Sequence, residues 1–258
     1  MPRRLGQHFL SRLSIADRIA RAVCGDGTAL ALEIGPGKGA LTAPLLERAS
    51  KVVAIEVDPF FVHYLRQKFA GPIAAGRLEL IEGDILKTDL AAYGRAAIAG
   101  NLPYYITSPI LQKVFSLGDC RQNMWLRAVF LVQAEVAARL AAAPGSRDYG
   151  YLSVLTQIGS RPEILFEVPR IAFRPPPKVD SAVVLLEPRD AAAEFQLPDK
   201  SRFLRFAAAC FRHKRKTLRN NLAPIYGRER LDAIEEGRLR AEQLSLAELA
   251  GLYRKLHP

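Results

Sequence analysis

The chain has 258 residues, of which 49% are hydrophobic and 24% are charged, a composition typical of an ordinary globular protein. No apolar run reaches the ~18 residues of a membrane span, and the first residues lack the apolar core of a signal peptide. We therefore expect a cytoplasmic protein with no membrane partner. The formal net charge of +11 predicts a polyanionic partner, of which nucleic acid is the commonest.

The cysteines and histidines are scattered along the chain. Cys24, Cys120 and Cys210 are odd in number and far apart, which argues against a disulfide framework and a C-x-x-C metal site. The four histidines are spread as widely. We therefore expect no structural metal.

The N-terminal segment allows two interpretations. Ser14 has the side chain of a helix N-cap, and apolar residues on one face predict a helix that continues to about Val23. The preceding residues, from Gln7 through His8 to Leu10, either pack on the domain or form a lid over a ligand. The residues alone leave both interpretations open.

A strand over residues 29–34 leads into a glycine-rich turn and a second helix. The turn contains Gly35, Gly37 and Gly39, which permit tight bends and a close approach of a ligand to the backbone. A dinucleotide is one interpretation of such a loop, but Glu33 at the strand end would repel a pyrophosphate. The pattern fits a cationic ligand better, such as a sulfonium or an ammonium group.

Two further strands also end in acidic residues. Glu56 follows Gly35 by 21 residues, a position from which a carboxylate accepts hydrogen bonds from ribose hydroxyls. Asp84 stands at the end of the strand predicted over residues 78–85, where it would accept a hydrogen bond from an adenine amine, with Ile85 against the ring. Because Glu33, Glu56 and Asp84 follow a regular pattern, we expect one shared pocket at the carboxyl edge of a parallel sheet.

The motif Asn101-Leu102-Pro103-Tyr104 comes directly after the apolar strand at 95–100. The Asn101 carbonyl can accept a hydrogen bond from an exocyclic amine, and the carbonyl of Leu102 or Pro103 can accept a second one. Tyr104 offers a ring on which a base can stack. The motif therefore predicts a site that grips a flat aromatic amine and frees its lone pair for attack.

The middle of the chain continues the alternation of strands and helices. The pattern predicts a helix from Thr107, and further strands and helices at 127–133, 134–142, 151–158, 163–168 and 180–186. Between the last two strands, three consecutive prolines stiffen the segment that carries Phe173, Arg174 and Lys178. This segment is either a rigid connection or a device that presents Phe173 to a flipped base.

The C-terminal part is denser in positive charge. After a linker at 188–198 the pattern is helical, and the basic run comprises Arg212, Lys214, Arg215, Lys216 and Arg219. Because few acids lie nearby, phosphate contact is favoured over a merely solvated face. We expect a catalytic domain over residues 1–188 and a small all-α domain over residues 189–258.

Four segments together resemble the ribosomal RNA adenine N6-dimethyltransferase family, in the family's order and across nearly the whole chain. They are Gly6–Leu10, Glu33–Gly37, Asn101–Tyr104 and Phe173–Val183, and the match is close to the family's bacterial small-subunit (16S) members. The resemblance implies a Rossmann-like, class I S-adenosylmethionine-dependent methyltransferase fold. It also implies a monomer that dimethylates two adjacent adenosines in the 3′-terminal hairpin of 16S rRNA.

The resemblance assigns roles to the candidate residues. Gln7, His8 and Leu10 would close over S-adenosylmethionine, and the loop with Glu33, Gly35 and Gly37 would hold its methionine part. The ribose and adenine contacts would come from Glu56, Asp84 and Ile85. Asn101 would touch both cofactor and substrate, with Leu102, Pro103, Tyr104 and Phe173 around the flipped adenine. The RNA contacts would come from Arg174, Lys178 and the basic run.

Three alternatives remain. One is a large-subunit rRNA methyltransferase of the antibiotic-resistance type, which the segment 173–183 and the basic tail disfavour. Another is a ribosome assembly factor for which methylation is secondary. The last is a DNA amine methyltransferase, against which the lack of a target-recognition domain in so short a chain counts.

Overall fold

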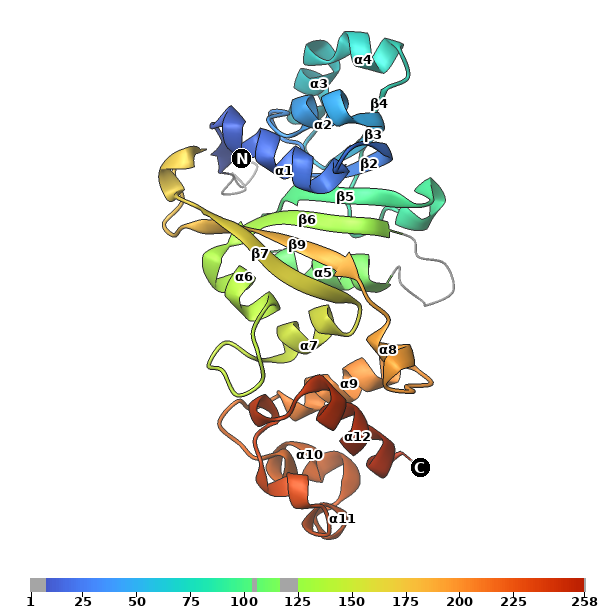
Figure 1. The fold of residues 1–258 in the computed structure, drawn as a ribbon, viewed down its shortest axis with the longest axis vertical. Helices are drawn as coiled ribbons and strands as arrows, with labels where there is room; N and C mark the ends of the chain where they lie inside the picture. The colour runs from blue at the N-terminus through green and yellow to red at the C-terminus, as the bar shows by residue number, and fades with distance from the viewer. Residues whose placement is uncertain (1–7, 104–105, 117–124, 258) are drawn as a thin grey trace. The chain divides into compact units, whose positions relative to one another are not determined.

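The computed structural model describes residues 8–103, 106–116 and 125–257 (Figure 1). The chain packs into two compact units. The first contains Met1–Ala137 and Glu163–Pro188, and the second contains Ala138–Pro162 and Arg189–Pro258. The sequence predicts a catalytic domain over residues 1–188. In the structure, residues 138–162 of that range group instead with the C-terminal helices.

The sheet has seven strands, in the order β4-β3-β2-β5-β6-β9-β7. The strands are β2 (Thr28–Ile34), β3 (Ala49–Glu56), β4 (Leu78–Glu82), β5 (Ala96–Asn101), β6 (Trp125–Gln133), β7 (Ser160–Val168) and β9 (Ser181–Pro188). The pairs from β4 to β6 are parallel, and β9 runs antiparallel to β6. The chain moves outward from β2 to β4 and then crosses back to β5, so a topological switch point lies between β2 and β5.

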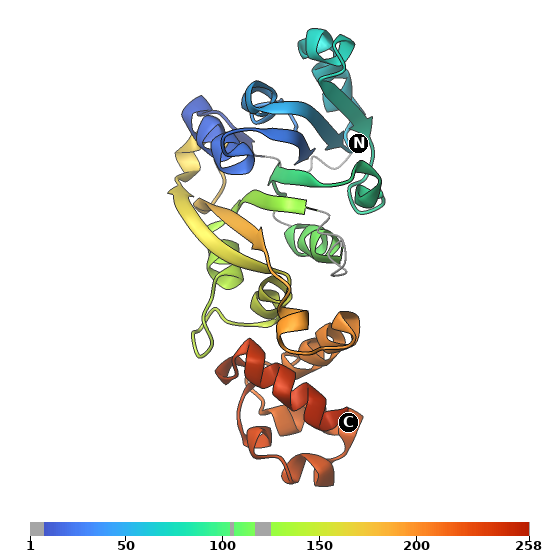
Figure 2. The same ribbon diagram turned by 45° about the vertical axis from the view of Figure 1, so that its right-hand side comes forward.

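Helices cover both faces of this sheet. They are α1 (Leu13–Cys24), α2 (Thr42–Arg48), α3 (Pro59–Lys68), α4 (Ala70–Ala74), α5 (Thr107–Ser116) and α6 (Ala134–Leu140), with the 3₁₀ turn η1 (Leu90–Tyr93). The apolar face of α1 packs with alternate strand residues, among them Ala97 and Val129. Figures 1 and 2 show α5 on the side of β5 and β6 that is opposite to α1. Because both faces are covered, the strands carry continuous apolar runs.

The helix starts differ from expectation at one place. The N-cap of α1 is Arg12, whose side chain makes no capping hydrogen bond, and Ser14 lies inside the helix. The expected N-cap at Ser14 was wrong because burial of the apolar face, rather than local capping, sets where this helix begins. The start of α3 has a local cap instead, with the Asp58 side chain accepting from the Phe60 N–H and Pro59 in the first turn.

A second, small sheet joins two distant segments. Strand β1 (Phe9–Leu10) pairs antiparallel with β8 (Phe173–Arg174), which follows the 3₁₀ turn η2 (Arg170–Ala172). The N–H and the hydroxyl of Ser11 both donate to the Ala172 carbonyl. We call residues 8–11 the strap, because this pairing fastens them to the segment after β7.

The second unit is built from short helices around their own core. They are α7 (Tyr151–Gln157), α8 (Ala191–Glu194), α9 (Lys200–Cys210), α10 (Leu218–Tyr226), α11 (Arg228–Asp232) and α12 (Leu246–Leu256), with 3₁₀ turns η3 (Glu235–Arg238) and η4 (Ala241–Gln243). Phe203, Ala207 and Cys210, which share one face of α9, lie in this core. Part of the expected linker is helical, since α8 lies within it. No helix in the described ranges is long and apolar enough to cross a membrane.

Candidate active site

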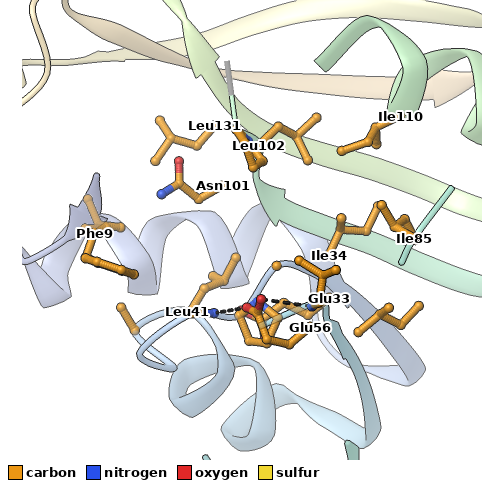
Figure 3. A pocket seen from close by; sticks show the side chains of 18 of the residues that line it. Phe9, Glu33, Ile34, Leu41, Glu56, Ile85, Asn101, Leu102, Ile110 and Leu131 are labelled. Atoms are coloured by element: carbon orange, nitrogen blue, oxygen red, sulfur yellow. Dashed lines mark hydrogen bonds between the residues drawn. The ribbon is translucent and has the colours of Figure 1, made fainter. Parts of the chain in front are cut away.

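A pocket opens at the carboxyl ends of β2, β3 and β5 (Figure 3). The strand-end acids Glu33, Glu56 and Asp84 all line it, together with Asn101 and the strap residue His8. The shared pocket expected from the regular placement of the acids is thus what the fold produces. Parallel register explains it, because β2 pairs with both β3 and β5 and brings their ends to one edge.

The glycine loop needs glycine for its backbone conformation. Gly35 and Gly37 have φ of +66° and +53°, values that residues with a side chain rarely adopt. A Cβ on Gly37 would lie 3.0 Å from the Phe9 ring, whereas a Cβ on Gly35 would meet nothing within 4 Å. Gly37 therefore permits the strap to pack on the loop, and Gly35 leaves room on the pocket side for a ligand.

Glu33 is buried at the base of the pocket with 2% of its surface exposed. The Thr42 hydroxyl donates to its carboxyl over 2.6 Å. Burial raises the pKa of Glu33 to about 8, an effect that the Thr42 hydrogen bond partly offsets. The carboxyl is therefore largely protonated at neutral pH, and a cation bound next to it would favour its ionised form. Sequence reasoning missed Thr42, whose role depends on how α2 meets β2.

Glu56 joins the glycine loop to the start of α3. One of its carboxylate oxygens accepts from the N–H groups of Val57 and Asp58 at 2.9 and 3.0 Å, and the other accepts from the Gly37 N–H at 3.0 Å. Each oxygen of a carboxylate has capacity for about two hydrogen bonds, so the second oxygen can still accept one from a ligand. Glu56 thus shapes the loop as well as facing the pocket.

Asp84 and Ile85 form another wall. The Asp84 side chain accepts from the Leu86 N–H at 2.9 Å, which fixes the turn after β4. Ile85 is 7% exposed and points its apolar side chain to the same wall of the pocket (Figure 3). A turn acid beside a flat apolar surface can bind a base by its exocyclic amine and its ring face.

A hydrogen bond to the strap sets the orientation of the Asn101 side chain. Its Nδ2 donates to the carbonyl of His8 over 3.0 Å. Since a carbonyl can only accept, the amide nitrogen must face the strap, and Oδ1 then faces away from it, as Figure 3 shows. Among the described residues no donor reaches Oδ1. Asn101 therefore presents a free acceptor at the end of β5.

The backbone carbonyls of Leu102 and Pro103 differ in the hydrogen bonds that they already accept. That of Pro103 already accepts from the Ile106 N–H at 3.1 Å and the Thr107 hydroxyl at 3.0 Å. The Leu102 N–H donates to the Leu131 carbonyl, which holds this residue against β6. Of the two carbonyls proposed as a second acceptor for an amine, that of Leu102 is the better placed to serve.

Phe173 does not occupy the expected position. Its side chain is 2% exposed and packs in the core with Leu10, Val168 and Ala172, so its ring offers no face to a base here. The physical reason is that pairing of β8 with β1 turns Phe173 inward. Arg174 and Lys178 are exposed, as expected of RNA contacts. Gln7 and Tyr104 lie outside the described residues.

The basic loop, Arg212–Lys216, lies between α9 and α10 in the second unit, and all its side chains are exposed. The buried amide of Asn221 anchors it, since Nδ2 donates to the carbonyls of Cys210 and His213 and Oδ1 accepts from the His213 N–H. Arg219 differs, because its guanidinium is bound to the Asp232 carboxylate. Sequence reasoning missed both anchors, which join residues apart in the chain.

Comparison with known proteins decides which family the site belongs to. A family model described as "Ribosomal RNA adenine dimethylase" matches residues 2–254. The chain belongs to this family. Its relatives include "Ribosomal RNA small subunit methyltransferase A" of Acidobacterium capsulatum, 42% identical over 98% of this chain and 90% of that protein. The protein of the same name from Xanthomonas euvesicatoria is 43% identical over 96% and 93%.

Solved structures of similar shape support the fold of this dimethylase. A dimethyladenosine transferase from Plasmodium falciparum has a TM-score of 0.78 and 25% identity, covering 96% of this chain and 98% of that one. The 23S rRNA methyltransferase ErmE has a TM-score of 0.69 and 27% identity, covering 97% and 100%. The fold is that of a class I S-adenosylmethionine-dependent methyltransferase, as expected.

The residues present fit the methyl donor of this dimethylase, S-adenosylmethionine. Two buried carboxyl groups suit its cationic methionine end and its ribose hydroxyls, the open side of Gly35 leaves space, and Ile85 supplies an apolar wall. Within the described ranges, no three His, Cys, Asp or Glu side chains cluster as metal ligands would.

Proposed function

We propose that this chain dimethylates the N6 amines of two adjacent adenosines in the 3′-terminal hairpin of 16S rRNA, on the small ribosomal subunit in the cytoplasm. The observation that carries the proposal is the free Oδ1 of Asn101, held by the strap at the edge of the pocket. The choice of subunit rests on the relatives, which are named small subunit methyltransferases.

S-adenosylmethionine, when bound, supplies a methyl group activated by its sulfonium. Glu56 would accept hydrogen bonds from the ribose hydroxyls, and Asp84 and Ile85 would hold the adenine. Gly35, Gly37 and Glu33 would surround the methionine part, with His8 and Leu10 on the strap side. The position of each side chain around the pocket and its hydrogen-bonding capacity support these proposed roles.

The target adenine must leave its stack to reach the site. Its amine would donate to Asn101 Oδ1 and to the Leu102 carbonyl, which together favour a tetrahedral nitrogen whose lone pair is free to attack. Pro103 stiffens this loop, and Tyr104 would stack on the base. No general base is required, because the methylated ammonium loses its proton to solvent afterward. Positioning then accounts for most of the catalysis.

RNA would be held by cations in both units. In the first unit, Arg174 and Lys178 follow the strap-bound strand β8. In the second, Arg212, Lys214, Arg215 and Lys216 form the basic loop on its Asn221 anchor. A loop fixed by a buried amide loses little entropy when phosphate binds, which favours contact with an RNA backbone.

The test is methyl incorporation from labelled S-adenosylmethionine into small subunits that lack the hairpin methylation, with large subunits and duplex DNA alongside. We expect label in small subunits only. Label in large subunits would instead indicate a large-subunit rRNA methyltransferase of the antibiotic-resistance type, and label in DNA would indicate a DNA amine methyltransferase. Tight small-subunit binding without any label would make assembly the primary role. Gel filtration of the same preparation tests the expected monomeric state.

A further inference from the structure

The strap brings three parts of the first unit together at one backbone group, the carbonyl of His8. This carbonyl accepts the Asn101 amide at 3.0 Å. On one side of it, Phe9 packs with Phe61 at a ring distance of 5.2 Å and lies over Gly37. On the other, the Phe9–Leu10 strand pairs with Phe173–Arg174. The group that orients Asn101 is thus itself placed by the glycine loop and by the segment after β7.

The His8 side chain adds a further restraint. Its Nδ1 lies 2.8 Å from the carbonyl of Pro175. Because a carbonyl only accepts, Nδ1 must carry the proton and donate. The imidazole therefore binds the segment beyond β8, while the carbonyl of the same residue binds Asn101. A hydrogen bond at the side chain and one at the backbone fix this residue between the RNA-facing segment and the site.

We propose that His8 is a positioning residue for methyl transfer: its imidazole, bound to Pro175, holds its own carbonyl where it keeps the Asn101 amide turned with Oδ1 toward the substrate amine. Without that restraint the carbonyl moves, and the amide can rotate to present Nδ2 instead. An amide nitrogen donates and would repel the amine hydrogens. This inference rests on the proposed function, since it assigns Oδ1 to the adenine amine.

The chain offers a close replacement and a matched control. In asparagine, Nδ2 is as many bonds from Cα as Nδ1 is in histidine, so His8→Asn retains a donor for Pro175, whereas His8→Ala does not. Ser11→Ala removes another hydrogen bond between the strap and the same segment, that of the Ser11 hydroxyl to the Ala172 carbonyl at 2.9 Å. It leaves the His8 carbonyl untouched, and the Ser11 N–H still donates to Ala172.

The experiment measures single-turnover methyl transfer to small subunits, equilibrium binding of S-adenosylmethionine, and thermal unfolding. At saturating S-adenosylmethionine, we expect His8→Ala to lower the transfer rate about tenfold, the effect of one lost hydrogen bond, with the unfolding temperature near that of wild type. His8→Asn should restore most of the rate, and Ser11→Ala should leave it within about twofold of wild type.

A double-mutant cycle distinguishes a positioning role of His8 from a merely structural one, because only the first makes the rate lost on His8→Ala depend on the residue at position 101. In an Asn101→Ser background, where no amide remains to be oriented, His8→Ala should cost little further rate. Equal losses in both backgrounds, a His8→Asn protein as slow as His8→Ala, or a loss confined to cofactor affinity would each overturn the inference. Absence of transfer by the wild-type protein would instead contradict the proposed function.

Discussion

The two sides of the pocket differ in how completely the chain satisfies its own polar groups. On the cofactor side, Glu33 and Glu56 are buried and already accept hydrogen bonds from Thr42 and from three backbone N–H groups. On the substrate side, Asn101 has one hydrogen-bond partner among the described residues, and its Oδ1 accepts from none of them. The polar groups on the cofactor side are thus held in place by the protein itself, whereas Asn101 Oδ1 on the substrate side can accept a hydrogen bond from a substrate amine.

This difference predicts that substitutions on the substrate side act on turnover, and those on the cofactor side act on affinity and stability together. The experiments below begin with the largest expected effect; those on Asn101, Glu56 and Glu33 test that division, and the last concerns RNA binding outside the pocket.

Asn101→Ala should abolish methyl transfer almost completely. Loss of a hydrogen-bonding group aimed at the reacting atom typically lowers turnover by about 100-fold or more, and here Oδ1 is the acceptor that orients the amine. RNA binding, measured by filter retention of small subunits, should stay near wild type. A variant with near-normal turnover would falsify the role of this residue.

Glu56→Ala should weaken both folding and cofactor binding. It would leave the N–H groups of Gly37, Val57 and Asp58 without their acceptor. Gly37 is buried, and an unsatisfied buried donor costs about 1–3 kcal/mol. We expect a free energy of unfolding lower by about 2 kcal/mol and a large loss of affinity for S-adenosylmethionine. Calorimetric titration and denaturant unfolding measure the two. If the variant lost affinity but kept its stability, or lost stability but kept its affinity, Glu56 would not serve both folding and cofactor binding.

Glu33 should make cofactor binding depend on pH. Burial raises its pKa to about 8; the Thr42 hydrogen bond lowers the pKa, the Glu56 charge raises it and Lys68 lowers it. The empty folded protein therefore holds a proton that the unfolded chain releases near pH 4.5, so stability contributed by this group falls as pH rises from 4.5 to 8. Binding of a cation should expel the proton, so affinity should rise over the same range.

Calorimetric titration at pH 7 in two buffers of different ionisation enthalpy measures that proton release. Glu33→Gln, which cannot ionise, should show none and should lack the rise in affinity with pH. Equal proton release from the wild type and the variant would mean that another group titrates on binding.

The basic loop should contribute to RNA affinity without affecting the pocket. Replacing Arg212, Lys214, Arg215 and Lys216 with glutamine should lower the dependence of log affinity on log salt by up to about 3. Arg219→Gln should change it least, because this guanidinium is already paired with Asp232. Titrations of small subunits at several salt concentrations test this. If the fourfold variant had the same slope of log affinity against log salt as wild type, the loop would be a solvated surface that makes no phosphate contacts.

Local sequence patterns predicted much of this molecule. The strands were visible as apolar runs ending in Glu33, Glu56 and Asp84, and parallel pairing alone brings those ends to one edge. Asp58 and Pro59 carry their capping chemistry in adjacent residues. Such features depend on neighbours in the chain, although Ser14, whose side chain also suits an N-cap, lies inside α1.

What could not be predicted depends on residues far apart in sequence. Phe173 is buried because its strand pairs with the strap, and nothing in the proline-rich segment reveals that partner. The hydrogen bond from Asn101 to the His8 carbonyl spans 93 positions. Residues 138–162 join the second unit through packing with helices near the C-terminus, which no local composition signals.

The central claim is that the Asn101 edge directs methyl groups to the exocyclic amine of adenine. The most direct measurement is mass spectrometry of nucleosides from small subunits treated with the wild-type protein and S-adenosylmethionine. The account predicts N6,N6-dimethyladenosine, with two methyl groups on each of two adjacent residues. Methyl groups on a ring nitrogen or on a ribose hydroxyl would contradict it, because neither would be held by an acceptor at Oδ1.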